Sequence, residues 1–129
     1  MDVLHTAIWV DDVEAMKAFY TEGLGLEYSR EFVGDDGVTN YFLTGESDTE
    51  LQFKYDEDED ESGGREVEPS GFDHTAIAVT EIDDTVDTLV AEYDGSVDQE
   101  PTTMDDMGVR ISFVSDPDGY GVELIETLE

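Results

Sequence analysis

Hydrophobic and polar positions alternate in two blocks of the chain that have nearly the same sequence. The first block begins at His5 and reads HTAIWV, and the second begins at His74 and reads HTAIAV. Alternation of this kind, rich in β-branched residues, predicts a half-buried β-strand. Acidic residues follow both blocks, at positions 11–12 and 81–84, where they favour the start of a helix. The chain therefore contains an internal repeat that begins with a strand and continues into a helix.

Apolar side chains at helical spacing follow each block. In the first half they are Val13, Met16, Phe19 and Tyr20, and in the second half they are Val86, Leu89, Val90 and Tyr93. Glycine often ends a helix because it adopts a left-handed conformation without strain. We therefore expect the first helix to end at Gly23 or Gly25 and the second to end at Gly95.

Extended segments separated by turn residues complete each half. They cover residues 26–33, 37–43 and 50–55 in the first half, and residues 97–103, 109–115 and 120–128 in the second. The sequence DPDG at residues 116–119 predicts a turn between the last two strands. Each half thus reads βαβββ, which predicts an α+β fold of two tandem modules. Because halves of this size are too small to be independent domains, we predict one domain over residues 1–129, with module one at 1–55, an acidic linker at 56–71 and module two at 72–129.

The chain is strongly acidic. It has 36 Asp and Glu residues against 5 Lys and Arg residues, which gives a net charge of −31. So few cations exclude binding to nucleic acid or to an anionic membrane, and repulsion on this scale suggests a salt-rich cytosol in which charges are screened. The absence of cysteine excludes disulfides and thiol nucleophiles. No stretch predicts a membrane span or a signal peptide, so we expect a cytoplasmic protein.

The two halves also end alike, with Glu-Leu at positions 50 and 123. Strand alternation places His5 on a face with Ala7 and Trp9, and Glu123 on a face with Ile125, so we expect both to point to a largely apolar side. A buried unpaired carboxylate is unfavourable, and a shared divalent cation removes that cost. We therefore predict a metal site made of His5, Glu50, His74 and Glu123, whose two nitrogens and two oxygens suit Ni, Co, Fe, Mn or Zn. The alternative is that these four are surface residues without a shared ligand.

Longer stretches around these residues are similar to a known family. They are Leu4-His5-Thr6, Phe19-Tyr20, Leu24-Gly25-Leu26, Glu50-Leu51, His74 with Ala76, and residues 113–126 with the sequences DPDGY and ELIE. Together they resemble the glyoxalase I (lactoylglutathione lyase) family of the vicinal oxygen chelate superfamily, over nearly the whole chain. The resemblance implies the vicinal oxygen chelate fold, in which two βαβββ modules form mixed, curved sheets.

The resemblance also implies an assembly and a mechanism. The expected assembly is a homodimer in which His5 and Glu50 of one chain and His74 and Glu123 of the other hold one divalent metal ion, with Ni or Co favoured. The expected substrate is the hemithioacetal of methylglyoxal and a low-molecular-weight thiol. The metal would stabilise an enediolate. Glu123, as the base, would carry a proton between adjacent carbons to give a lactoyl thioester, and Glu50 could serve the opposite face.

The residues expected at the thiol depart from the family pattern. Glutathione-using relatives typically carry Arg, Asn and Lys where this chain has Trp9, Lys54 and Asp105. Few cations therefore remain for the two carboxylates of glutathione, and a smaller thiol such as γ-glutamylcysteine is the alternative. The side chains expected to contact the substrate are Trp9, Phe53, Lys54, Arg110 and Tyr120.

Two other functions remain open on the sequence alone. The same four ligands could support another activity of the superfamily, such as epimerisation or thiol transfer. Acyl-thioester epimerases usually carry Gln at the second ligand position, so Glu50 favours glyoxalase I. The other alternative is a metal-free dimer of the bleomycin-resistance type, which would sequester a ligand between walls formed by Trp9, Phe53 and Tyr120.

Overall fold

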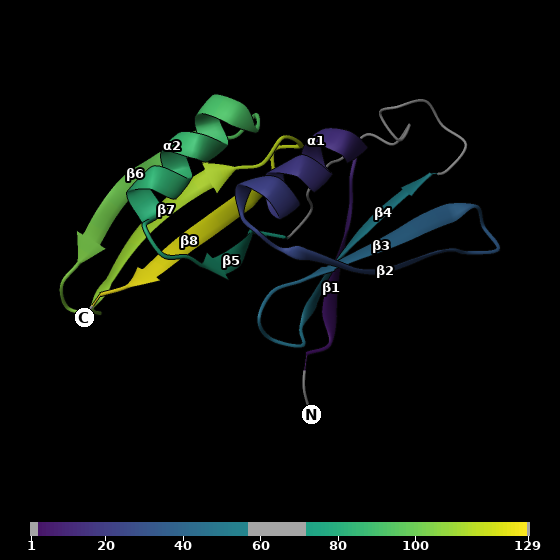
Figure 1. Ribbon diagram of the computed structural model, residues 1–129, viewed down its shortest axis with the longest axis horizontal. Coiled ribbons are helices and arrows are strands. Elements are labelled where there is room, and N and C mark those ends of the chain that lie inside the picture. Colours follow the sequence, from purple (N-terminus) through teal and green to yellow (C-terminus); the bar gives the residue numbers. More distant parts are fainter. Residues whose placement is uncertain (1–2, 57–71, 129) are drawn as a thin grey trace. The chain divides into compact units, whose positions relative to one another are not determined.

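The structure is a computed structural model that describes residues 3–56 and 72–128. The chain divides into two compact units, residues 1–68 and residues 69–129 (Figure 1). Each unit contains one of the predicted modules, so the two-module α+β fold is confirmed. The predicted acidic linker at 56–71 lies outside the described residues from position 57 onward. None of the helices in the described part of the chain combines the length and hydrophobicity that crossing a membrane requires.

Unit 1 is a four-stranded mixed sheet with one helical segment. Its elements are β1 (His5–Trp9), α1 (Val13–Ala18), η1 (Phe19–Gly23), β2 (Glu27–Val33), β3 (Val38–Thr44) and β4 (Glu50–Asp56). The strand order is β1-β4-β3-β2, with β1 parallel to β4 and the other pairs antiparallel. The helix begins at Val13 because the side chain of Asp12 accepts a hydrogen bond from the backbone N–H of Ala15 at 3.2 Å. The helical segment continues as one π-type turn, η1, to Gly23, which is one of the two predicted endpoints.

Unit 2 repeats this arrangement. Its elements are β5 (His74–Ala78), α2 (Ile82–Glu92), β6 (Ser96–Met104), β7 (Val109–Ser115) and β8 (Gly121–Thr127), in the strand order β5-β8-β7-β6. Here no side chain of the preceding loop caps the helix. Instead, the carboxylate of Glu126 on β8 accepts the backbone N–H of Ile82 at 2.9 Å. The cap therefore also fastens α2 to its own sheet, across which the helix lies in Figure 1.

Among the described residues, each sheet has one face that packs against a helix and one face that does not. In unit 1 the helix face carries Phe53, which is fully buried and contacts the ring of Tyr20 at 5.4 Å between centroids. In unit 2 the helix face carries Val122 and Leu124, both fully buried. Because side chains alternate along a strand, His5 and His74 lie on the opposite faces, which we call the histidine face of each unit.

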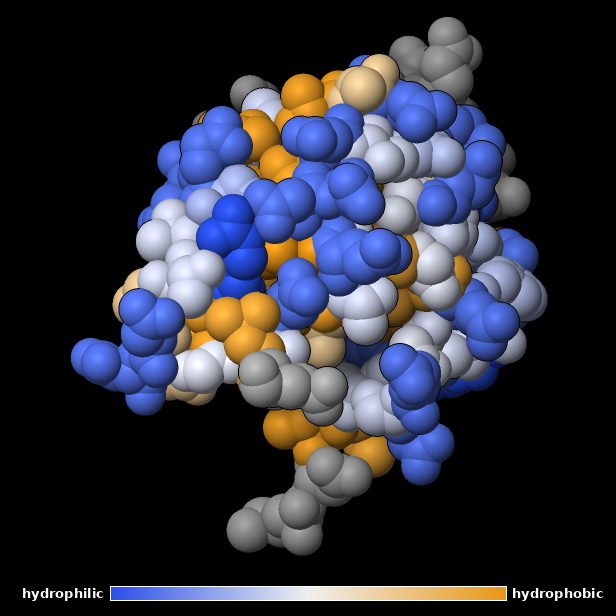
Figure 2. Space-filling model, turned by 60° about the vertical axis from the view of Figure 1, so that its left-hand side comes forward, coloured by the Kyte–Doolittle hydropathy of each residue, from blue (hydrophilic) through white to orange (hydrophobic). Residues whose placement is uncertain are grey.

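The acidic residues of the described segments, 3–56 and 72–128, are spread over the surface rather than concentrated at one place. Hydrophilic residues cover most of the face visible in Figure 2, and apolar residues appear between them in small areas. Most of the acidic residues in the described part of the chain are exposed or half-buried, and Asp116 is the buried exception at 3% exposure. The core is apolar, as its fully buried Phe19, Leu43 and Ile82 show.

Candidate metal-binding site

The histidine face of unit 1 carries one half of the predicted metal site. His5 is the first residue of β1, and the parallel pairing places Glu50 directly beside it on β4. Two residues further along, Ala7 lies beside Gln52. The ring of His5 meets Phe42 of β3 edge-on, with centroids 5.8 Å apart and planes at 86°. Three adjacent strands thus bring the imidazole, two polar side chains of β4 and one aromatic ring together.

The carboxylate of Glu50 is bound by two side chains of β2. It accepts a hydrogen bond from the hydroxyl of Ser29 at 2.7 Å, and from the guanidinium of Arg30 at 3.2 Å and 3.4 Å. Hydrogen bonds from Arg30 and Ser29 hold the pKa of Glu50 below its usual value. The guanidinium also lies over the ring of Phe42, 3.8 Å from the centroid. Glu50 is therefore ionised and held as the partner of Arg30.

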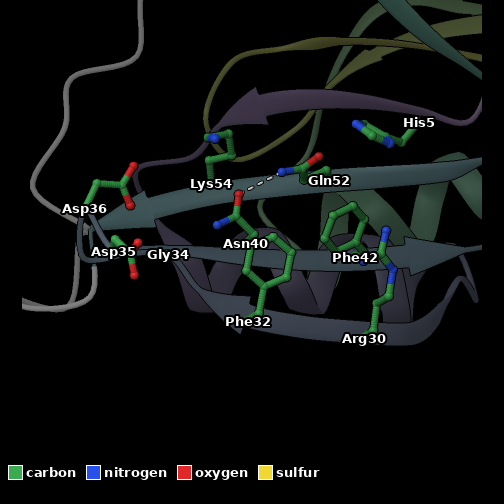
Figure 3. Close-up of a pocket in the computed structure, with 10 residues that line it drawn as sticks. All are labelled: His5, Arg30, Phe32, Gly34, Asp35, Asp36, Asn40, Phe42, Gln52 and Lys54. Carbon is green, nitrogen blue, oxygen red and sulfur yellow. Dashed lines mark hydrogen bonds between the residues drawn. The ribbon is translucent and has the colours of Figure 1, made fainter.

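A chain of amide hydrogen bonds orients Gln52. The side-chain N–H of Asn40 donates to the backbone carbonyl of Val38 at 3.1 Å, which leaves the side-chain oxygen of Asn40 as an acceptor. That oxygen receives the side-chain N–H of Gln52 at 2.7 Å. The oxygen of Gln52 therefore points the other way, and Figure 3 shows it turned toward the side on which His5 lies.

An open pocket of about 590 Å³ covers this part of the histidine face (Figure 3). Its lining residues are His5, Arg30, Phe32, Gly34, Asp35, Asp36, Asn40, Phe42, Gln52 and Lys54. Arg30 and Lys54 are two of only five cations in the chain. Lys54 lies 5.4 Å from the ring of Trp9, on the same face. The pocket thus combines an imidazole, an amide oxygen and positive charge in a chain that has little positive charge.

Unit 2 carries the other half of the predicted site. The imidazole Nε2 of His74 lies 3.3 Å from a carboxylate oxygen of Glu123, and the ring Nδ1 contacts Asp73 at 2.6 Å. The hydrogen bond to Asp73, together with the charges of Asp73 and Glu123, raises the pKa of His74. When the imidazole is neutral, the bond to Asp73 keeps the proton on Nδ1 and leaves the lone pair of Nε2 on the side of Glu123.

The donor set of unit 2 fits a divalent cation. Zinc-type ions bind imidazole nitrogen and carboxylate oxygen at about 2.1 Å, so two neighbouring ligands of one ion lie about 3 Å apart. The spacing of 3.3 Å between Nε2 of His74 and the oxygen of Glu123 is close to that value. Within the described residues, no three His, Asp or Glu side chains lie close enough to hold a metal ion together. Each unit by itself therefore holds two of the four predicted ligands, a pair that we call its predicted half site.

The strand register corrects one step of the sequence argument. The repeat of Glu-Leu at positions 50 and 123 matched Glu50 with Glu123. In unit 2, however, His74 lies beside Gly121 and Ala76 lies beside Glu123. Since Ala7 lies beside Gln52 in unit 1, the residue equivalent to Glu123 is Gln52, and the residue equivalent to Glu50 is Gly121. The shared Glu-Leu dipeptide gave the wrong match because it lies two residues earlier along the last strand of the first module than of the second.

The remaining predicted site residues lie at different places. Trp9 and Lys54 are on the histidine face of unit 1. Phe53 is fully buried on the helix face, and Arg110 is on the helix face of unit 2, where it donates to both oxygens of Asp83 at 2.9 Å. Tyr120 precedes β8 and is buried, which raises its pKa to about 12. The structure therefore does not place Phe53 or Arg110 at either half site.

Four residues that the sequence argument did not name contribute to the half sites: Arg30, Asn40, Gln52 and Asp73. Two of them had a signal in the sequence. Asp73 directly precedes His74, and Gln52 follows His5 at nearly the spacing that separates Glu123 from His74. Arg30 and Asn40 had none, because their positions depend on the pairing of β2 with β3 and of β3 with β4.

Comparison with known proteins agrees with this fold. A model of the Glyoxalase/Bleomycin resistance protein/Dioxygenase superfamily matches residues 2–124. The chain is 34% identical over 133 residues to a probable lactoylglutathione lyase of Synechocystis, a match that covers 98% of this chain and 96% of the relative. It is 35% identical over 130 residues to a probable chloroplastic lactoylglutathione lyase of Arabidopsis thaliana, covering 96% of this chain but only 35% of that relative.

Among solved structures, the trypanothione-dependent glyoxalase I of Leishmania major matches with a TM-score of 0.77 and 28% sequence identity, over 98% of this chain and 86% of that chain. The resemblance found in the sequence is thereby confirmed at three levels: family model, sequence and fold. The chain belongs to the glyoxalase/bleomycin resistance protein/dioxygenase superfamily.

Proposed function

We propose that this chain is a metal-dependent lyase of the glyoxalase I type, which converts the hemithioacetal of methylglyoxal and a low-molecular-weight thiol into a lactoyl thioester. The observation that carries the proposal is the contact between the imidazole of His74 and the carboxylate of Glu123 on the histidine face of unit 2. Such a pair provides both a nitrogen ligand and a proton-transferring base at one place. The relatives named lactoylglutathione lyases support the same reaction.

The proposed metal ligands are His5, His74, Glu123 and one oxygen-bearing side chain of β4. The cation is divalent, with Ni or Co favoured. When bound, it polarises the substrate oxygens and lowers the cost of removing a proton from carbon. In the family that this chain resembles, a homodimer completes the site with one half from each chain, and we propose the same assembly here.

Glu123 is the proposed base. Its carboxylate removes the proton from the carbon that bears the hydroxyl group and the sulfur, and the electron pair moves toward the adjacent carbonyl carbon and its oxygen. Protonated Glu123 then returns the proton to that adjacent carbon, while the hydroxyl proton passes from the first oxygen to the second. The first carbon becomes the thioester carbonyl. Substrate and product are isomers, so the reaction needs no oxidant, reductant or second reactant.

The cations of unit 1 are the proposed contacts for the thiol. Lys54 and Arg30 line the pocket on the histidine face, and low-molecular-weight thiols of the glutathione type carry carboxylates. Arg30 already forms an ion pair with Glu50, which compensates its charge. Lys54 is therefore the better candidate for binding a carboxylate of the substrate. Glutathione and γ-glutamylcysteine both carry two carboxylates, so Lys54 can pair with one carboxylate of either thiol, and both are candidates.

The test is the ultraviolet absorbance of the thioester product. Metal-free protein is reconstituted with Ni, Co, Mn or Zn in molar KCl, and given methylglyoxal with either glutathione or γ-glutamylcysteine. The proposal expects turnover that depends on the metal and is removed by a chelator. If the metal-loaded protein forms no lactoyl thioester with either thiol, the glyoxalase assignment is wrong.

The position of Gln52 favours a second candidate, an acyl-thioester epimerase. Members of the superfamily with that activity usually carry Gln at the second ligand position, and Gln52 corresponds to Glu123 in the strand register, which supports this candidate. The chemistry is related, because a base again removes a proton beside a thioester carbonyl. Exchange of that proton with deuterated solvent in a chiral acyl thioester, without any lactoyl thioester formation, would decide for the epimerase.

A further inference from the structure

We propose that Gln52, not Glu50, is the side chain of β4 that binds the metal ion, and that Glu50 acts only as the partner of Arg30. The proposal rests on the proposed function in one respect, because it assumes that the histidine faces of the two units hold a divalent cation. It goes further in assigning the ligands. The metal centre then contains two imidazoles, one amide oxygen and one carboxylate.

The first argument is the position of the residues in the two sheets. The proposed ligands of unit 2 are separated by one step of strand alternation, since His74 lies beside Gly121 and Glu123 lies beside Ala76. In unit 1 the same step leads from His5 to Gln52, which lies beside Ala7. Glu50 lies directly beside His5, at the place that Gly121 occupies in unit 2. No ligand is available from a glycine side chain, so that place is not the ligand place of the repeat.

The second argument is the aromatic ring that backs each pair. On the neighbouring strand, Phe42 lies beside Gln52 and Phe113 lies beside Glu123. Each ring also meets its histidine edge-on, with centroids 5.8 Å apart for His5 and 5.6 Å apart for His74. Both half sites therefore consist of a histidine, an edge-on phenylalanine and an oxygen donor from the last strand of the module. In this arrangement Gln52 corresponds to Glu123.

The third argument is which oxygen is free to bind a cation. The side-chain N–H of Gln52 is fixed on Asn40, so its carbonyl oxygen faces the pocket (Figure 3), and no described donor reaches it. Both oxygens of Glu50 already accept hydrogen bonds from Arg30, and one of them also accepts the hydroxyl of Ser29. Binding a metal through Glu50 would break these hydrogen bonds. It would also bring the positively charged guanidinium of Arg30 close to a divalent cation, and the repulsion between the two charges opposes binding.

The assignment has a chemical consequence. A neutral amide in place of a second carboxylate leaves more of the positive charge of the metal uncompensated, which favours binding of substrate oxygens with negative charge. It also leaves Glu123 as the single carboxylate among the ligands. Proton transfer then takes place on one face of the substrate only, and this chain should accept one of the two hemithioacetal stereoisomers.

Titration of the metal-free protein with Co²⁺ in molar KCl tests the proposal without any substrate. The visible absorption bands of Co²⁺ change when a ligand is exchanged, whereas a change of charge outside the ligands leaves their shape the same. For Gln52→Ala we expect at least tenfold weaker Co²⁺ binding and a changed spectrum. Gln52→Glu restores an oxygen ligand, and we expect it to recover Co²⁺ binding with a spectrum that differs from both other proteins.

The matched variant for Glu50 is the double replacement Arg30→Gln with Glu50→Gln. It removes the ion pair as a whole, so the net charge beside the site is unchanged. We expect Co²⁺ affinity within about threefold of the original protein and an unchanged spectrum. Circular dichroism and the thermal unfolding midpoint establish that each variant is folded. Since Gln52→Glu differs from the original by one atom, it keeps the test valid if Gln52→Ala does not fold.

The outcomes separate this proposal from the proposed function. If the double variant loses Co²⁺ binding and Gln52→Ala keeps it, Glu50 is the ligand, and the ligand assignment is wrong while the metal-dependent function stands. If the original protein binds no Co²⁺, Ni²⁺ or Zn²⁺, both are wrong. If Co²⁺ binding follows Gln52 but no lactoyl thioester forms, the ligand assignment stands and the glyoxalase reaction is wrong.

Discussion

The two units place a histidine, an edge-on phenylalanine and an oxygen-bearing side chain in equivalent positions. The charges around the two histidines differ. In unit 2, His74 lies between two carboxylates, with Asp73 on one ring nitrogen and Glu123 near the other. In unit 1, His5 has no carboxylate in an equivalent position, because Leu4 precedes it and Gln52 replaces Glu123. The carboxylate that strand pairing places beside His5 belongs to Glu50, whose charge is compensated by Arg30.

This difference in charge suggests that the two copies of the module have different functions. Unit 2 concentrates negative charge at its histidine, which suits cation binding and proton transfer. Unit 1 places Arg30 and Lys54 around its histidine, which suits an anionic substrate. In both units these polar residues lie on the histidine face, while the apolar core lies on the helix face.

The largest expected effect comes from removing the carboxylate that distinguishes unit 2. Glu123→Gln makes its half site resemble that of unit 1, and we expect turnover to fall about 10²–10⁴-fold because the proton-transferring base is lost. The measurement is thioester formation with the metal-loaded protein at saturating substrate. Glu92→Gln, at the exposed end of α2, removes one carboxylate elsewhere and serves as the control. Undiminished activity of Glu123→Gln would show that another group is the base.

A smaller effect is expected from the carboxylate that orients His74. Asp73→Ala removes the acceptor at 2.6 Å from Nδ1, so the imidazole loses its fixed orientation and its preference for the tautomer with a free Nε2. We expect about 10–100-fold weaker Co²⁺ binding, the range found when such partners of metal-binding histidines are replaced.

Asp73→Asn is the control for that experiment. Its side-chain oxygen still accepts a hydrogen bond from Nδ1 of His74, but the side chain no longer carries a charge. We expect it to recover most of the affinity for Co²⁺. If Asp73→Ala and Asp73→Asn weaken binding equally, the effect of Asp73 comes from its charge and not from orientation of the ring.

The comparison of the units also shows how far the sequence alone predicts this molecule. The strands, both helices and the position of each histidine at the start of its module were predictable, since hydrophobic period and turn residues are local properties. The residue of β4 that corresponds to Glu123 was not predictable, because strand alternation puts Glu50 and Gln52 on one face and only the pairing with β1 decides between them. The pocket could not be predicted either, because Arg30 and Asn40 reach it through the pairing of β2 and β3.

Two of the predicted substrate contacts, Phe53 and Arg110, lie away from the histidine faces for a simpler reason. Alternation itself puts Phe53 on the face opposite Gln52, and it puts Arg110 opposite Phe113. Both residues were predicted from their chemical type, an aromatic side chain and a cation. The strand alternation that gave the face of the histidines was not applied to them. In the structure, the ring of Phe53 packs against Tyr20 in the core, and the guanidinium of Arg110 binds Asp83 of α2.

The smallest expected effect separates the cations of the two units. Lys54 lines the pocket of unit 1, whereas Arg110 is bound to Asp83 on the helix face of unit 2. For Lys54→Gln we expect KM for the hemithioacetal to rise about 3–10-fold with little change in kcat, because one exposed ion pair with a substrate carboxylate contributes roughly 1 kcal/mol and equally in ground and transition states. For Arg110→Gln we expect both constants to be unchanged. Since each variant loses one positive charge, their difference reports position and not the net charge of the chain. Equal increases in KM would mean that the general field of the protein, and not a contact in unit 1, guides the anionic thiol to the site.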